Sequence, residues 1–265
     1  MKINYCLNLE SSGLKVDFSL NDVPLFRRHS PRPAKYSNLM NPWLHRGDNF
    51  IHLKFESFEA AEDLPPELKA LAQDEKKRKL DVDLTDLDSG KSIWKFQYPA
   101  ANIHRALPFE LPPNEGIVRV GEGVEKWSWE QPSPPELTPL LEQDLFDAFL
   151  AIYRAFTERD APGLMSLGKT RNQETAVSLG MAPPAYEADC LKDWNATFAD
   201  HAPALLPQVK GPHDLLFEPC WKKCLYRVTT LDELPPLATQ RDSTGMKMSF
   251  DVYLGQVNGK WVWVR

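Results

Sequence analysis

QPSPPELTPLLEQDLFDAFLAIYRAF, residues 131–156, is the stretch that divides the chain, because its hydrophobic period changes within it. Its first nine residues, 131–139, contain four prolines, which fix φ and lack an amide donor, so we expect a linker there. From Leu140 onward, apolar side chains recur every three to four residues, as on one face of a helix. These apolar residues are Leu141, Leu145, Phe149, Ile152, Tyr153 and Phe156. The stretch therefore predicts a proline-rich linker followed by a long helix.

The residues before the linker, 1–130, show mainly the two-residue period of β-strands. Polar and apolar side chains alternate at 15–20 (KVDFSL) and 80–84 (LDVDL), and a turn at 88–91 (DSGK) precedes the run at 93–98 (IWKFQY). Further strands are expected at 50–55, 117–120 and 124–129, and one charged helix at 65–79. Several short strands separated by turns predict a β-sandwich-like domain over residues 1–130.

The residues after the linker, 140–265, combine both periods. Beyond the long helix, further helices are expected at 172–179 and 184–199, and strands at 215–217, 224–229, 246–256 and 260–264. Asn258 and Gly259 join the last two strands, and this pair suits a type I′ hairpin turn. Helices followed by an antiparallel meander predict an α+β domain, and the fold class expected for the whole chain is α+β.

Bulk composition restricts the possible partners. The net charge of −6 disfavours phosphate backbones and anionic membranes and favours a basic partner. No apolar run approaches membrane-spanning length and no signal peptide is recognisable, so we expect a cytoplasmic protein. The four cysteines, Cys6, Cys190, Cys220 and Cys224, are unevenly spread, which suits reduced thiols better than a disulfide framework.

The order of elements after the linker resembles the NTF2-like fold. A long first helix leads through residues 159–164 (RDAPGL) into more helices, and the meander ends at residues 259–264 (GKWVWV). The resemblance covers about residues 140–265. It implies helices packed on a curved antiparallel sheet, and because that fold serves enzymes, binding modules and assembly domains alike, it implies no particular activity.

The whole layout is similar to that of two-domain bacterial immunity proteins, which neutralise toxins delivered in the manner of the type VI secretion system. The resemblance rests on architecture and character: a β-rich front domain, a proline-rich linker and an α+β back domain. It implies a non-catalytic cytoplasmic protein that binds a cognate toxin, for example a nuclease with a basic surface, and occludes it. Neither a cofactor nor direct binding to nucleic acid or membrane is expected.

Four aspartates lie close together in the front half, namely Asp81, Asp83, Asp86 and Asp88. They lack the glycine and the distal glutamate of an EF-hand, so that calcium site is not expected. On a strand, Asp81 and Asp83 project together, opposite the apolar residues at 80, 82 and 84. This face is either an ordinary solvated surface or an acidic strip that attracts a basic partner, and we assign the four aspartates to partner binding as a hypothesis.

Two pairs of tryptophans are spaced to share one face of a strand: Trp127 with Trp129, and Trp261 with Trp263. Most tryptophans of a globular protein lie in its core, whereas an exposed pair is a good hot spot or ligand platform. Trp127 and Trp129 are included in the partner-binding hypothesis.

Residues 163–170 (GLMSLGKT) match the phosphate-binding pattern G-x-x-x-x-G-K-[ST]. That motif requires a strand before it and a helix after it, whereas the preceding residues have the period of a helix that breaks at 160–162. Nucleotide binding through Lys169 and Thr170 is therefore only a third hypothesis, and the same segment also suits a short helix that packs on the core.

For metal binding and catalysis, the sequence contains only incomplete motifs. Cys220, Cys224 and His213 have a spacing admissible for zinc, but a closed site needs four ligands, so no metal site is expected. No G-x-S-x-G elbow occurs, and we do not expect an enzyme. The second hypothesis is an NTF2-like small-ligand-binding protein or enzyme, with a pocket in the back domain. The candidates to line such a pocket are Tyr153, Tyr186, Asp189 and Trp194.

Overall fold

The computed structural model describes residues 4–58, 64–99, 107–121, 123–131, 135–205, 209, 211–242 and 247–265. Its contacts divide the chain into two compact units, Met1–Glu125 (unit 1) and Lys126–Arg265 (unit 2). The boundary expected from the sequence lies at residue 130. Residues 132–134 of the expected linker lie outside the described residues.

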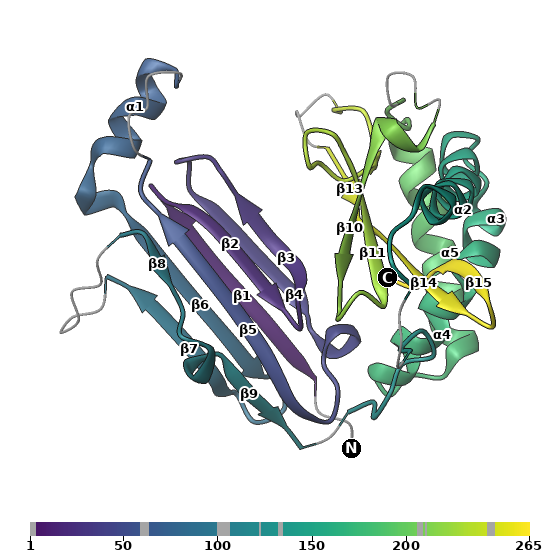
Figure 1. Cartoon of the computed structure of the whole chain (residues 1–265), viewed down its shortest axis with the longest axis horizontal. Coiled ribbons are helices and arrows are strands. Elements are labelled where there is room, and N and C mark those ends of the chain that lie inside the picture. Colours follow the sequence, from purple (N-terminus) through teal and green to yellow (C-terminus); the bar gives the residue numbers. More distant parts are fainter. Residues whose placement is uncertain are drawn as a thin grey trace. The chain divides into compact units, whose positions relative to one another are not determined.

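The first sheet of unit 1 is four-stranded and antiparallel (Figure 1). In spatial order its strands are β4 (Ala34–Leu39), β1 (Tyr5–Ser12), β6 (Lys79–Asp86) and β7 (Lys91–Tyr98). In β6, Leu80, Val82 and Leu84 are buried, while the residues between them are half-buried. The alternation expected at 80–84 is therefore confirmed, and so is the hairpin that joins β6 to β7.

The second sheet of unit 1 is built around a long strand, β5 (Gly47–Glu56). The other strands are β3 (Val23–Arg28), β2 (Lys15–Leu20), β8 (Phe109–Glu110) and β9 (Ile117–Val120). β2 lies between β3 and β5, while β8 and β9 pair with opposite ends of β5. Asn21 and Asp22, with φ of 52° and 63°, form the turn between β2 and β3, because their short polar side chains tolerate positive φ.

Aromatic contacts connect the two sheets of unit 1. The ring centroid of Phe55, on β5, lies 5.6 Å from that of Phe96 and 5.1 Å from that of Tyr98, both on β7. Val16 and Phe18 on β2 are also buried, at 0% and 2% exposed, as the alternation at 15–20 predicts. The core of unit 1 therefore consists of the inward-facing side chains of both sheets.

The helix expected at 65–79 is shorter than predicted. α1 (Pro66–Gln73) ends before Asp74, whose Oδ1 accepts a hydrogen bond from the backbone amide of Lys76 at 3.1 Å. That bond starts a new 3-10 turn, η2 (Glu75–Lys77), and β6 follows directly. The other 3-10 turns among the described residues are η1 (Asn41–Trp43), η3 (Pro113–Glu115) and η4 (Pro212–Asp214).

Unit 2 begins with helices, as its sequence period predicts. They are α2 (Pro139–Thr157), α3 (Ala161–Leu167), α4 (Lys169–Ser178) and α5 (Pro183–Asp200). Thr138 is the N-cap of α2, and its hydroxyl accepts a hydrogen bond from the amide of Leu141 at 3.2 Å. Leu145, Phe149 and Phe156 are completely buried, which confirms the predicted stripe of α2.

The helices of unit 2 lie on one side of its antiparallel sheet (Figure 1). In spatial order the strands are β10 (Leu215–Cys220), β11 (Leu225–Thr230), β14 (Val252–Val257) and β15 (Lys260–Trp263). β12 (Leu237–Ala238) and β13 (Ser249–Phe250) form a separate two-stranded ladder. The turn from β14 to β15 has positive φ at Asn258 and Gly259, as a type I′ turn requires.

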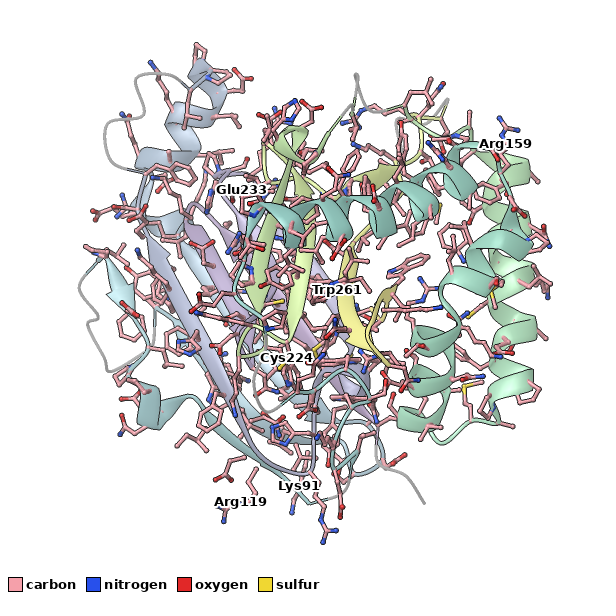
Figure 2. All side chains as sticks on the ribbon, turned by 45° about the vertical axis from the view of Figure 1, so that its right-hand side comes forward. Lys91, Arg119, Arg159, Cys224, Glu233 and Trp261 are labelled. Carbon is pink, nitrogen blue, oxygen red and sulfur yellow. The ribbon has the colours of Figure 1, made fainter. Side chains whose placement is uncertain are left out.

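The fold is mixed α/β, with antiparallel sheets and, in the described residues, five α-helices, which is compatible with the expected α+β class. The strand expected at 124–129 is wrong: Val124 makes a single bridge to His45, and Trp127 and Trp129 pack in unit 2. Arg159, after α2, and Glu233, after β11, also have positive φ, 58° at each. Both residues are labelled in Figure 2. Among the described residues, no helix is both long and apolar enough to cross a membrane.

Candidate functional site

The acidic residues of β6 lie on a face that also carries lysines. Asp81 and Asp83 point away from the core, as the alternation predicts. The Nζ of Lys79 lies 2.5 Å from Oδ2 of Asp81, and Lys95 on β7 is directly opposite Asp83. The hydrogen bond to Asp81 raises the pKa of Lys79. The face is a mixed-charge surface rather than an acidic strip.

Asp86 and Asp88 belong to the turn that follows β6. Oδ1 of Asp86 accepts hydrogen bonds from the backbone amides of Asp88 and Ser89, at 2.9 and 3.2 Å, and Oδ2 accepts one from the Ser89 hydroxyl at 2.7 Å. The hydrogen bond from the Ser89 side chain lowers the pKa of Asp86. The side chain of Asp86 therefore stabilises the turn. Asp86 is half-buried, whereas Asp88 is exposed.

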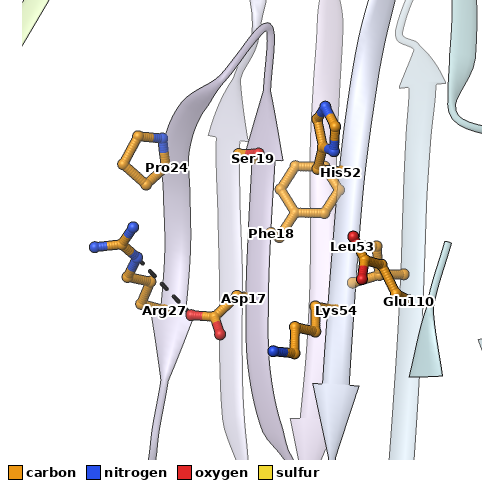
Figure 3. A pocket seen from close by; sticks show the side chains of 9 residues that line it. All are labelled: Asp17, Phe18, Ser19, Pro24, Arg27, His52, Leu53, Lys54 and Glu110. Atoms are coloured by element: carbon orange, nitrogen blue, oxygen red, sulfur yellow. Dashed lines mark ion pairs between the residues drawn. The ribbon is translucent and has the colours of Figure 1, made fainter. Parts of the chain in front are cut away.

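The outer side of the second sheet of unit 1 carries a shallow groove of about 110 Å³ (Figure 3). We call this outer side the β5 face and define it by Asp17, Arg27, Asp48, Phe50, His52, Lys54, Glu110, Ile117 and Arg119. The groove is lined by Asp17, Phe18, Ser19, Pro24, Arg27, His52, Leu53, Lys54 and Glu110. Four strands contribute to it, so its shape depends on the register of the sheet.

Charges alternate across the groove. Arg27, Asp17, Lys54 and Glu110 are consecutive cross-strand partners on β3, β2, β5 and β8. Arg27 Nε lies 3.8 Å from Asp17 Oδ1, and Nε2 of His29 approaches the same oxygen at 3.2 Å. Opposite charges on neighbouring strands attract one another, which stabilises the register of the sheet. Because positive and negative side chains alternate, the row as a whole is largely neutral.

An exposed apolar pair lies on the same face, beyond the groove. Phe50 on β5 and Ile117 on β9 are directly opposite each other and remain 44% and 46% exposed. Beside them, Arg119 donates to both carboxylate oxygens of Asp48, at 2.6 and 3.1 Å, and this guanidinium lowers the pKa of Asp48. The sequence predicts both strands. It does not show that Phe50 and Ile117 are neighbours on the exposed face, because that depends on how the strands pair in the folded sheet.

Trp127 and Trp129 are 2% and 0% exposed, so their assignment to partner binding is corrected. Their rings stack with centroids 6.3 Å apart and planes 4° from parallel. The guanidinium of Arg265 lies 4.1 Å from the centroid of Trp127, while Glu174 accepts a hydrogen bond from Trp129 Nε1 at 3.1 Å. We call Trp127, Trp129, Arg171, Glu174, Trp263 and Arg265 the arginine–tryptophan cluster.

The second arginine of this cluster, Arg171, lies 3.8 Å from the ring centroid of Trp263. Burial lowers the pKa of both Arg171 and Arg265 to about 10, so both remain charged at neutral pH. Burial also raises the pKa of the neighbouring Tyr186 to about 12 and that of the Cys190 thiol. The cluster is thus cationic, with a neutral phenol and a neutral thiol beside it.

The segment that matches the phosphate-binding pattern is not a loop. Residues 163–167 belong to α3, and Lys169 begins α4. The amide of Gly163 donates to Asp160 Oδ1 at 2.9 Å, because Asp160 caps α3. The element directly before α3 is the helix α2 and not a strand. The nucleotide-binding hypothesis is therefore wrong in its structural premise, and the expected short helix is confirmed.

Cys220 and Cys224 flank the turn between β10 and β11 and are both buried. The Sγ of Cys224 donates to the carbonyl oxygen of Gln131 at 3.4 Å. Cys224 is the residue directly before β11 (Figure 2). His213 has a side chain that is 79% exposed. In the part of the chain that the structure describes, no group of three or more His, Cys, Asp or Glu is placed to hold a metal ion.

In unit 2, a pocket of about 470 Å³ lies beside α5. We call it the α5 pocket and define it by Asp193, Trp194, Ala196, Thr197, Asp200, His201, Met248 and Phe250. The residues from α5 are spaced by one, three, four and seven positions from Asp193, so they share one side of the helix. Met248 and Phe250 close the pocket from the β13 side.

Aromatic rings form the floor of the α5 pocket. The centroids of Trp194 and Phe250 are 4.8 Å apart, and Phe198 stacks on Trp194 at 5.6 Å. Trp194 is 6% exposed, whereas Phe250 is half-buried. Asp193 and Asp200 are exposed at the rim, two helical turns apart. The pocket therefore combines an apolar floor with an acidic rim.

Of the residues proposed from the sequence to line a pocket, only Trp194 lies in the α5 pocket. Tyr153 stacks on Phe149 at 5.9 Å, Tyr186 packs beside Cys190, and Asp189 is exposed one turn before Asp193. The spacing of Asp193, Thr197 and Asp200 was a usable signal, because i, i+4 and i+7 positions share a helix face.

Comparisons with protein-family models, with curated proteins and with solved structures found no match for this chain.

Proposed function

We propose that this chain is a non-catalytic binding protein whose partner is another protein. In its most specific form, the proposal is a cytoplasmic immunity protein that neutralises a secreted bacterial toxin by occlusion. The finer fold assignment belongs to the same proposal: unit 1 as a β-sandwich-like domain and unit 2 as an NTF2-like domain. The sheet-to-sheet contacts of Phe55 and the packing of α2 on β14 and β15 support that assignment.

The observation that carries the binding proposal is the exposed pair of Phe50 and Ile117 on the β5 face. Two large apolar side chains that lie side by side offer a partner a single patch to cover, and aromatic residues are enriched among interface hot spots. The bidentate ion pair of Asp48 and Arg119 borders the patch, as polar groups border the apolar centre of many interfaces.

The charge of the chain indicates the character of the partner. The net charge is −6, and the described ion pairs of the β5 face neutralise one another. Long-range attraction of a basic partner is therefore a property of the whole chain, while the β5 face supplies short-range contacts.

The test starts from affinity capture of the tagged chain from its native cells, followed by purification of the captured protein and mixing at known ratios. We expect one partner, bound at equimolar ratio, whose toxic activity disappears at the same ratio. Phe50→Asp should weaken this binding at least about 10-fold, because a charge would be buried in the apolar centre. Ile117→Asp should act in the same direction.

Leu87→Asp is the matched control, since Leu87 is 50% exposed but lies in the turn after β6, away from the β5 face. Near-UV circular dichroism of each variant separates lost binding from lost folding. A partner that binds Phe50→Asp and the parent chain equally well would exclude the β5 face. Captured protein that shows no fixed stoichiometry would exclude the inhibitor proposal.

A second candidate function is small-ligand binding in unit 2, which the α5 pocket favours. Its volume of about 470 Å³ falls in the range of ligand pockets, and aromatic side chains with a few polar groups line it, as in many such sites. Thermal-shift screening of the parent chain against small-molecule libraries tests this function, because a ligand of the folded state raises the melting temperature.

A further inference from the structure

We infer that the α5 pocket binds a cationic organic group, either an ammonium or a guanidinium. The inference concerns a site in unit 2 and is independent of the protein partner proposed for the β5 face.

The first argument is the charge of the rim. Asp193 and Asp200 are exposed, and neither forms an ion pair or a hydrogen bond with another described side chain. The described residues of the lining include no lysine or arginine; besides the two aspartates they contain one titratable side chain, that of His201, and Lys192 and Lys247 are close in sequence. The rim therefore carries negative charge that the described residues leave uncompensated, and a cation is the ligand that such a rim attracts.

The second argument is the spacing of the two carboxylates. Seven residues of α-helix correspond to a rise of about 10.5 Å between Asp193 and Asp200. A single calcium ion needs oxygen ligands at about 2.3–2.6 Å, and two aspartate side chains do not bridge such a separation around one ion. A guanidinium or an alkylammonium that lies along the helix has the length to interact with either carboxylate or both.

The third argument is the aromatic floor. Trp194 and Phe250 lie with centroids 4.8 Å apart and planes at 44°, and Phe250 is partly open to the pocket. A cation within about 6 Å of a ring centroid is attracted by the negative face of the ring, and tryptophan gives the strongest attraction. Anions are disfavoured by both the rings and the rim, and neutral ligands gain only hydrogen bonds from Asp193 and Asp200, without the attraction between opposite charges.

Two kinds of ligand carry such a cationic group: a free small molecule, and a protein with a lysine or arginine side chain. N-acetyl-argininamide and N-acetyl-citrullinamide are suitable probes, because the two molecules have nearly the same shape and only the first is charged. A capped Gly-Gly-Arg-Gly-Gly peptide presents the same guanidinium within a chain. Ligand-observed NMR titrations of the full chain measure all three dissociation constants.

We expect N-acetyl-argininamide to bind with a dissociation constant in the millimolar range and citrullinamide at least about 5-fold more weakly. Asp193→Asn and Asp200→Asn should each weaken binding of the arginine probe by about 2- to 5-fold. Phe250→Leu should also weaken it. Asp189→Asn, one turn before Asp193 on the same helix but outside the pocket, should leave the affinity unchanged.

Peptide binding tighter than that of the single amino acid would assign the site to a protein side chain, and equal or weaker binding would assign it to a free cation. Equal binding of arginine and citrulline probes, or absence of binding by both, would overturn the inference. Equal effects of Asp189→Asn and Asp193→Asn would also overturn it, because the helix as a whole and not the pocket would then attract the cation. The partner test with Phe50→Asp gives its result independently of these outcomes.

Discussion

Arg265 forms an ion pair with Glu174 inside unit 2, with 3.0 Å between Arg265 Nη1 and Glu174 Oε2. The two side chains are 2% and 15% exposed. The same guanidinium lies over the ring of Trp127, at 4.1 Å from its centroid. Glu174 therefore compensates a cation that folding removes from water, and the indole fixes the position of that cation.

Glu174→Gln should destabilise unit 2 strongly. The substitution keeps the shape of the side chain but removes the negative charge of Glu174 from beside the buried Arg265, and it weakens the hydrogen bonds that Glu174 accepts from Ser128 N and Trp129 Nε1. Removing one partner of a buried ion pair costs about 3–5 kcal/mol of unfolding free energy. Urea unfolding monitored by tryptophan fluorescence measures the change.

Asp144→Asn is the control for that measurement, because Asp144 is exposed on α2 and forms no ion pair in the described residues. Its unfolding free energy should remain within about 0.5 kcal/mol of the parent value. If Glu174→Gln unfolds at the parent urea concentration, the ion pair contributes nothing measurable and the structural role of the cluster is refuted.

Thr138→Ala should shorten or destabilise α2. The Thr138 hydroxyl accepts the amide hydrogen of Leu141 at 3.2 Å, and an alanine leaves this helix-terminal donor without its partner. The expected loss is about 1 kcal/mol of unfolding free energy. Thr138→Ser keeps the hydroxyl, so it should retain nearly the full stability. Equal losses in both variants would show that the methyl group and not the cap is responsible.

The phenol of Tyr186 should ionise at a higher pH than an ordinary tyrosine. Burial raises the pKa of its phenol from 10.0 to about 12. A raised folded-state pKa contributes stability that is complete below about pH 10 and is lost as pH rises through about 12, because the unfolded chain releases its proton first. Burial lowers the pKa values of Arg171 and Arg265 to about 10, so their effect is opposite: their contribution to the free energy of unfolding rises as the pH increases above about 10.

A spectroscopic titration isolates Tyr186 from the two arginines. The tyrosinate absorbance of the Tyr186→Phe variant, subtracted from that of the parent chain, should give a single transition near pH 12. Far-UV circular dichroism at each pH shows whether the chain is still folded. A difference transition near pH 10 in folded protein would mean that the phenol is open to solvent.

Most of the fold is predictable because it depends on local residue patterns. The stripe of α2 and the turn at Asn258 and Gly259 follow from side-chain spacing and backbone preference over a few residues, and both are confirmed. β1 is not predicted, although Tyr5, Leu7 and Leu9 alternate with polar residues and are buried. Only three apolar positions mark it, and its two neighbouring strands, β4 and β6, come later in the chain.

The candidate sites depend on contacts between distant residues, so the sequence predicts them poorly. Trp127 and Trp129 have the spacing of a strand face, but in the fold they are buried against Arg265 and Glu174, which lie far along the chain. The α5 pocket likewise needs Phe250, which the helix pattern does not contain. Alternation shows that Asp81 and Asp83 share a face, but it does not show which residues on neighbouring strands compensate their charge.

Gly255→Ala should destabilise unit 2, because no space is left for a side chain at this position of β14. A Cβ atom there would lie 2.8 Å from Trp129 Cβ and 3.0 Å from Leu225 Cδ2. Overpacking of a buried site costs about 1–3 kcal/mol of unfolding free energy. Gly121→Ala is the control, since nothing lies within 4 Å of its added Cβ, and it should change the unfolding free energy by less than about 0.5 kcal/mol. Urea unfolding of both variants measures these changes. Equal midpoints for Gly255→Ala and Gly121→Ala would show that Trp129 is not packed against β14.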